Sequence, residues 1–116
     1  MDWHELPDEW PRNGTSSALQ AAHIGLAGAG RVFGFTVYNS NAAAQFILVF
    51  DRSTIPGAGV TADLVFKAQA ADVLGVNWIP GRWFRSGCVL CNSSTAPTLT
   101  AGAADCLFDV QYDATD

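Results

Sequence analysis

Hydrophobic positions from about residue 17 onward form short runs of strand length, separated by Gly, Pro, Asn and Ser. Residues 31–39 (RVFGFTVYN) combine β-branched and aromatic side chains, which favour strands. Residues 45–51 (QFILVFD) are apolar almost without interruption, a pattern typical of a strand covered on both faces. Three more runs predict strands, and the Pro- and Gly-rich stretch 52–62 predicts a loop; the runs are 64–68, 73–79 and 84–92.

The last run, residues 105–113 (DCLFDVQYD), has the clearest period of two in the chain. One face takes Cys106, Phe108, Val110 and Tyr112, and the other takes Leu107, Asp109, Gln111 and Asp113. Residues 17–28 (SALQAAHIGLAG) contain helix-favouring alanines, but their alternation and glycines favour a strand. The PGR sequence at 80–82 predicts a turn between the strands on either side of it.

These runs make about seven or eight strands with frequent turn signals and no clear helix. We therefore expect an all-β fold, an antiparallel β-sandwich of jelly-roll-like form, spanning residues 17–116. Residues 1–16 show no strand or helix period and are expected to form an irregular, extended N-terminal arm. The arm carries Trp3, Leu6 and Trp10, residue types that anchor interfaces, so it is a candidate docking arm; the alternative is a disordered terminus.

The composition excludes several classes of partner. The net charge is -5 and only 15% of residues are charged, which gives no basic patch for nucleic acid. The acidic opening does not resemble a signal peptide, and the longest nearly apolar stretch, residues 42–50, is about half the length that a membrane-spanning helix needs. We expect a protein made in a cytoplasm that binds neither nucleic acid nor membrane.

Cys88 and Cys91 stand in the C-x-x-C spacing of metal sites and redox enzymes. Within a strand, an offset of three places the two side chains on opposite faces, so they can neither share a metal ion nor form a disulfide with each other. We expect these thiols and that of Cys106 to be reduced, buried and free of metal. His4 and His23 complete no metal-ligand or catalytic motif, so the sequence predicts no metal, no cofactor, no catalytic residue and no enzymatic activity.

Three aromatic residues, Trp78, Trp83 and Phe84, flank the PGR sequence. Aromatic side chains near a strand end can contact a protein or stack against a sugar ring. They can equally close one end of the sandwich core, and this second interpretation is favoured.

Three segments, VFGFTVYNSNAAAQFILVFD (32–51), GRWFRSGCVLCNSS (81–94) and GAADCLFDVQYD (102–113), together resemble a family of small β-rich bacteriophage structural proteins. The resemblance covers about residues 17–113 and consists of core and turn patterns. It implies a non-enzymatic virion accessory protein made in the host cytoplasm, with capsid decoration as the preferred role. It also implies a homo-oligomer, a trimer in particular, that contacts major capsid or tail proteins. The alternative is a carbohydrate- or receptor-binding module associated with a tail fibre, which would use Trp78 and Trp83.

Overall fold

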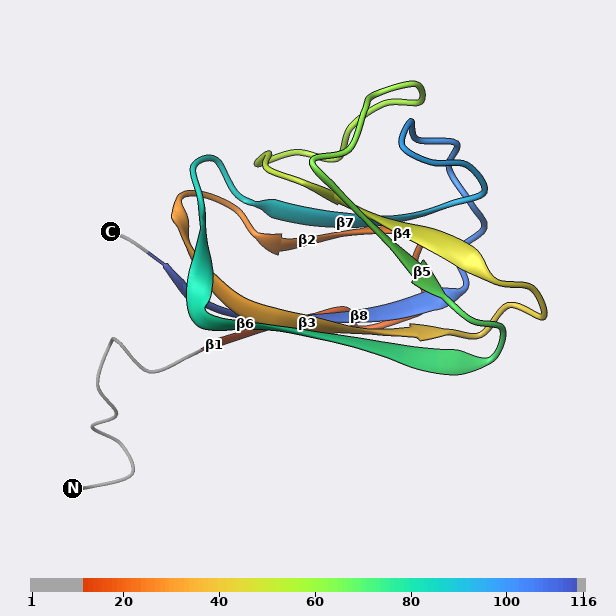
Figure 1. Ribbon diagram of the computed structural model, residues 1–116, viewed down its shortest axis with the longest axis horizontal. Coiled ribbons are helices and arrows are strands. Elements are labelled where there is room, and N and C mark those ends of the chain that lie inside the picture. Colours follow the sequence, from red (N-terminus) through yellow and green to blue (C-terminus); the bar gives the residue numbers. More distant parts are fainter. Residues whose placement is uncertain (1–11, 115–116) are drawn as a thin grey trace.

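The computed structural model describes residues 12–114, which form two four-stranded antiparallel sheets packed face to face (Figure 1). The strands are β1 (Arg12–Thr15), β2 (Ala22–Leu26), β3 (Gly30–Asn39), β4 (Gln45–Phe50), β5 (Leu64–Ala68), β6 (Asp72–Phe84), β7 (Cys88–Ser93) and β8 (Cys106–Ala114). Sheet A has the order β1-β8-β3-β6, and sheet B has the order β2-β7-β4-β5. The described residues contain no helix that is long and apolar enough to cross a membrane.

The pairing of the strands defines a jelly roll. The first four strands pair in turn with the last four, as β1 with β8, β2 with β7, β3 with β6 and β4 with β5. The chain is thus arranged as one long hairpin wrapped around a common core, and the β3–β8 and β4–β7 pairings complete the two sheets. The predicted antiparallel β-sandwich is confirmed.

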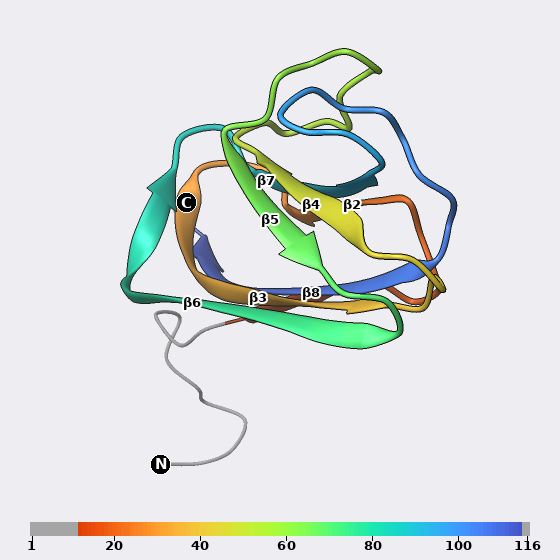
Figure 2. The same cartoon turned by 45° about the vertical axis from the view of Figure 1, so that its right-hand side comes forward.

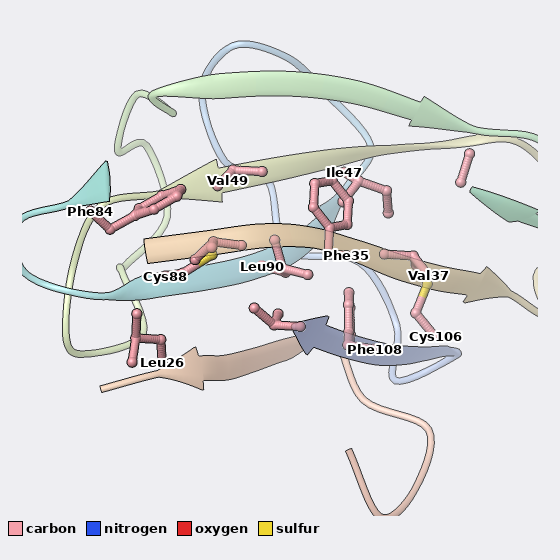
Figure 3. Packing of buried hydrophobic residues seen from close by; sticks show 13 residues of the cluster. Leu26, Phe35, Val37, Ile47, Val49, Phe84, Cys88, Leu90, Cys106 and Phe108 are labelled. Atoms are coloured by element: carbon pink, nitrogen blue, oxygen red, sulfur yellow. The ribbon is translucent and has the colours of Figure 1, made fainter. Parts of the chain in front are cut away.

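The main core lies between the sheets (Figure 3). The period of two predicted for the last strand is confirmed, because Cys106, Phe108 and Val110 are buried while Leu107 is exposed. These side chains meet residues from the facing sheet, among them Ile47 and Leu90.

Sheet B is covered on its outer face as well. Two long loops, 51–63 and 94–105, lie over β4 and β7 (Figure 2). The loops are joined by backbone hydrogen bonds, including one of 2.9 Å from the Leu99 N–H to the Val60 carbonyl. Beneath them lies a second apolar cluster of Leu48, Phe50, Val89, Cys91 and Leu99. The expectation that residues 45–51 are covered on both faces is therefore confirmed.

The predicted turn at residues 80–82 is wrong. Strand β6 runs through this position, and residues 78–81 form a bulge between the Gly34–Asn77 and Val32–Arg82 pairs. The chain turns instead just before β7, where Gly87 has a φ of 149° and a Cβ atom would lie 2.4 Å from the Arg52 carbonyl oxygen. Only glycine accommodates both constraints.

The boundary of the predicted arm also changes. Residues 12–15 form β1, the edge strand of sheet A, although their sequence RNGT has no strand period. The strand is held by its partner, because Asn13 and Thr15 donate side-chain hydrogen bonds to the Asp109 carboxylate. Tertiary contacts thus decide a segment whose local pattern is neutral.

Candidate functional site

The outer face of sheet A carries a row of apolar side chains. Tyr38 on β3 lies directly opposite Leu107 on β8 and Val73 on β6. The three side chains are 38%, 40% and 56% exposed, respectively. Five of the nine large hydrophobic side chains that are exposed in the described residues lie on strands of sheet A: Tyr38, Val73, Ile79, Trp83 and Leu107.

A small hollow of about 150 Å³ opens beside this β8-β3-β6 row, between β1 and β3. Its lining residues include Thr36, Tyr38, Leu107 and Asp109. An exposed apolar row next to a hollow with a few polar groups has the make-up of a protein-docking surface, in which a partner side chain fills the hollow.

A second group of residues, which we call the Ile79 patch, lies at the other end of sheet A and consists of the exposed Ile79 and Trp83 with the half-buried Arg31 and Phe33. Ile79 is 92% exposed at the β6 bulge, and Trp83 is 65% exposed. The Arg31 guanidinium carbon lies 4.9 Å from the Phe33 ring centroid and 5.6 Å from the Trp83 ring centroid. The arginine therefore holds both rings in place through cation–π contacts.

Next to the patch, an open hollow of about 620 Å³ is lined by Trp83, Arg85, Ser86, Asp51, Asp63 and Phe84. The Asp51 carboxylate fixes one wall by accepting backbone hydrogen bonds from Arg85 (3.0 Å), Ser86 (2.8 Å) and Gly87 (3.3 Å). Desolvation raises the pKa of Asp51, but these hydrogen bonds and the Arg85 charge outweigh it and keep the pKa below its ordinary value.

The three aromatic residues singled out in the sequence do not form one exposed surface. Phe84 is buried in the main core, and Trp78 is half-buried against it, with its ring 5.6 Å from that of Phe35 and 5.9 Å from that of Phe84. Trp83 is the one of the three that is available to a partner. The candidate docking residues Trp3, Leu6 and Trp10 lie outside the described residues.

The cysteines and His23 take structural positions. Cys88, Cys91 and Cys106 are free and buried, and Cys88 and Cys91 belong to clusters on opposite faces of sheet B, as their spacing predicts. Burial raises the pKa of Cys88 to about 12 and that of Cys91 to about 11, so neither thiol is an active nucleophile. The His23 Nε2 atom lies 2.8 Å from the Gly14 carbonyl oxygen.

A buried polar cluster was not visible in the sequence. Asp105 accepts hydrogen bonds from Gln45 (2.8 Å), Asn92 (2.8 Å) and Asn41 (2.7 Å). Asn39 is fully buried in the same cluster and accepts a bond of 2.9 Å from Gln45. These residues close the end of the sandwich away from the Ile79 patch. The Oδ1 atom of the fully buried Asn92 has no hydrogen-bond partner among the described residues.

Residues 12–114 contain no group of three or more His, Cys, Asp or Glu side chains able to hold a metal ion. The fold and the surfaces described above define a jelly-roll protein whose exposed large apolar side chains are concentrated on sheet A. No protein-family model, curated protein or solved structure matches the chain.

Proposed function

We propose that the protein is a non-enzymatic bacteriophage virion accessory protein, most specifically a capsid decoration protein, that acts through protein–protein contacts. The observation that carries the proposal is the exposed β8-β3-β6 row of Leu107, Tyr38 and Val73 on the outer face of sheet A. The resemblance of three sequence segments to small phage structural proteins supplies the virion context.

The jelly roll supports this role, since many viral capsid domains use it. The described residues present rigid strands, not long mobile loops, on the outer face of sheet A. A rigid apolar face is suited to packing against a repeated protein lattice, because little conformational entropy is lost when it docks. The same face can join copies of this chain in an oligomer, with a trimer as the expected form.

The alternative function, a carbohydrate- or receptor-binding module of a tail fibre, has one observation in its favour. Trp83 lies beside an open hollow that also contains Asp63 and Ser86. A sugar-stacking platform formed by all three aromatic residues is not available, because Trp78 and Phe84 pack in the core. The alternative therefore rests on a single indole ring.

The test is to add purified wild-type protein and variants to virions that lack it and to measure bound copies per particle. Tyr38→Ser and Val73→Ser should each weaken binding about tenfold, which corresponds to about 1.4 kcal/mol. Val65→Ser is the matched control, because Val65 is 43% exposed on β5 in the other sheet.

Each outcome separates the candidate functions. Loss of binding in Val73→Ser with unchanged binding in Val65→Ser supports docking through sheet A. If Val73→Ser and Val65→Ser reach the same number of bound copies per particle, docking through sheet A is overturned. Loss only in Trp83→Ser, reversed by soluble glycans, would support the carbohydrate-binding alternative.

A further inference from the structure

The Ile79 patch has the residue types of an interface anchor and no covering segment among residues 12–114. Ile79 and Trp83 are the two most exposed large hydrophobic side chains in this part of the chain. Arg31 lies against both aromatic rings of the patch, and a Cβ atom on Gly81 would lie 2.5 Å from its side chain. Trp and Arg are enriched in interface hot spots, and this end of sheet A presents Trp83, the stacked Arg31 and the exposed Ile79 together.

Basic residues outnumber acidic residues at this end of the sandwich, where Asp51, Asp63 and Asp113 also lie. The Arg31 guanidinium has a weak ion pair of 3.9 Å with Asp113, and its Nε has no hydrogen-bond partner among the described residues. The pairing row Arg12–Tyr112–Val32–Arg82 places two more arginines at this end of sheet A. They extend from the face that Val32 turns to the core, and the Arg82 guanidinium carbon lies 5.9 Å from the Trp78 ring centroid. Five of the chain's six basic residues gather at this end of the sandwich: Arg12, Arg31, Arg52, Arg82 and Arg85.

The segment that enters the fold at this same end has the complementary composition. Residues 1–11 contain four acidic residues, no Lys or Arg, and three large apolar side chains: Trp3, Leu6 and Trp10. The segment joins β1 at Arg12, which pairs with Tyr112 in the row that contains Arg82. Acidic groups beside tryptophans match a surface of arginines beside exposed apolar side chains.

Residues 1–11 are long enough to reach the Ile79 patch from Arg12. Three strand spacings separate β1 from β6, a distance of about 14 Å. An extended chain covers about 3.3 Å per residue, so eleven residues reach about 36 Å. Trp3 and Leu6 are therefore within reach of the patch.

We propose that the Ile79 patch is the docking site of the chain's own residues 1–11. Trp3 and Leu6 pack on Ile79 and Trp83, while the acidic side chains pair with the surrounding arginines. The proposal goes beyond the virion role and does not depend on it, since the contact forms in the purified protein and uses a different part of sheet A from the β8-β3-β6 row.

The test uses the two glutamates of the chain, Glu5 and Glu9, which both lie in this segment. A glutamate-specific endoprotease therefore cleaves the full-length protein only there. A docked segment is protected, so Ile79→Ser should increase the cleavage rate about fivefold or more, because truncation of an interface anchor releases the segment. Ile55→Ser is the matched control, since Ile55 is 54% exposed in the loop over sheet B.

Further measurements make the result specific. Arg31→Gln should also raise the cleavage rate, and added salt should raise it in the wild type, because salt screens the pairing of acids with arginines.

Protection that grows with protein concentration assigns the contact to a second copy, and protection independent of concentration assigns it to the same chain; both support docking. Equal cleavage rates in wild type, Ile79→Ser and Ile55→Ser overturn the proposal. Val73→Ser should keep the protection, so failure of the virion role is distinguished from failure of this contact.

Discussion

The outer faces of the two sheets differ in how they are covered. Loops 51–63 and 94–105 bury the outer face of the central strands β4 and β7 of sheet B, so that Leu48 and Val89 are inaccessible, while Val65 on the edge strand β5 stays exposed. The outer face of sheet A has no such cover among the described residues, and Leu107, Tyr38 and Val73 remain exposed. One sandwich thus has one face completed by its own chain and one face available to a partner.

The difference follows from the sequence of each sheet. Strand β4 is apolar at almost every position, so a cover over its second face is required to bury those side chains. Strand β8 alternates, and its outer face mixes Leu107 with polar residues such as Asp109 and Gln111. A mixed face tolerates water and can still contribute apolar contact area when a partner docks.

The largest expected difference in stability is between substitutions of two leucines, Leu48 on the outer face of sheet B and Leu107 on the outer face of sheet A. Leu48→Ala should lower the free energy of unfolding by about 2–5 kcal/mol, because the side chain is buried beneath the loops and leaves a cavity. Leu107→Ala should lower it by no more than about 1 kcal/mol, because the side chain is 40% exposed and its removal leaves no closed cavity. Urea denaturation of both variants measures the difference. Equal losses would mean that the loops do not protect sheet B in solution.

A smaller effect is expected at the polar end of the sandwich. Asp105→Asn keeps one acceptor oxygen, which can still accept from Gln45 and Asn92, but it replaces the oxygen that accepts from Asn41 by an NH₂ donor. The two facing donors should cost about 1–3 kcal/mol. Asp72→Asn is the matched control, because the one described hydrogen bond to the exposed Asp72 carboxylate, among residues 12–114, comes from the adjacent Val73 N–H. Chemical denaturation should show the control within about 0.5 kcal/mol of wild type. If Asp72→Asn lowered the free energy of unfolding as much as Asp105→Asn does, the Asp105 cluster would stabilise the fold no more than an exposed carboxylate.

The same carboxylate gives the protein a defined response to acid. Desolvation raises the pKa of Asp105, but hydrogen bonds from Gln45, Asn41, Cys106 and Asn92 outweigh it and lower the pKa from 3.8. A lowered folded-state pKa contributes stability above the unfolded value, and this stability is lost as the pH falls through the folded value. Urea midpoints should therefore be level from about pH 7 to about pH 5 and fall below about pH 4. Asp105→Asn should show a shallower decline; an identical decline would assign the acid response to other groups.

How far the sequence predicted these features depends on the range of the interactions. Periodicity predicted β8 and the two-sided burial of residues 45–51, because both depend on local alternation. The bulge at residues 78–81 and the strand at residues 12–15 were missed, since pairing with β3 and β8 decides them. The Asp105 cluster joins residues as far apart as Asn41 and Asp105, and no local pattern indicates such a contact. Trp78 and Trp83 are five positions apart in one continuous strand, so alternation places them on opposite faces, and the turn predicted at residues 80–82 concealed this relation.

The smallest effect concerns the rate of thiol modification in the native protein. Cys91 lies under the loops that cover sheet B, whereas Cys88 and Cys106 lie between the sheets. Exposure of Cys91 requires only that loops 51–63 and 94–105 lift, but exposure of the other two requires the sheets to separate. We therefore expect Cys91 to react with an excess of alkylating reagent about tenfold faster, since local opening is less costly than global opening. Mass spectrometry of partly labelled protein assigns the modified site, and urea-unfolded protein provides the reference in which all three thiols react alike. If all three were labelled at one common rate in the native protein, the loop cover and the sandwich core would open as a single unit, and the two faces of sheet B would not differ in stability.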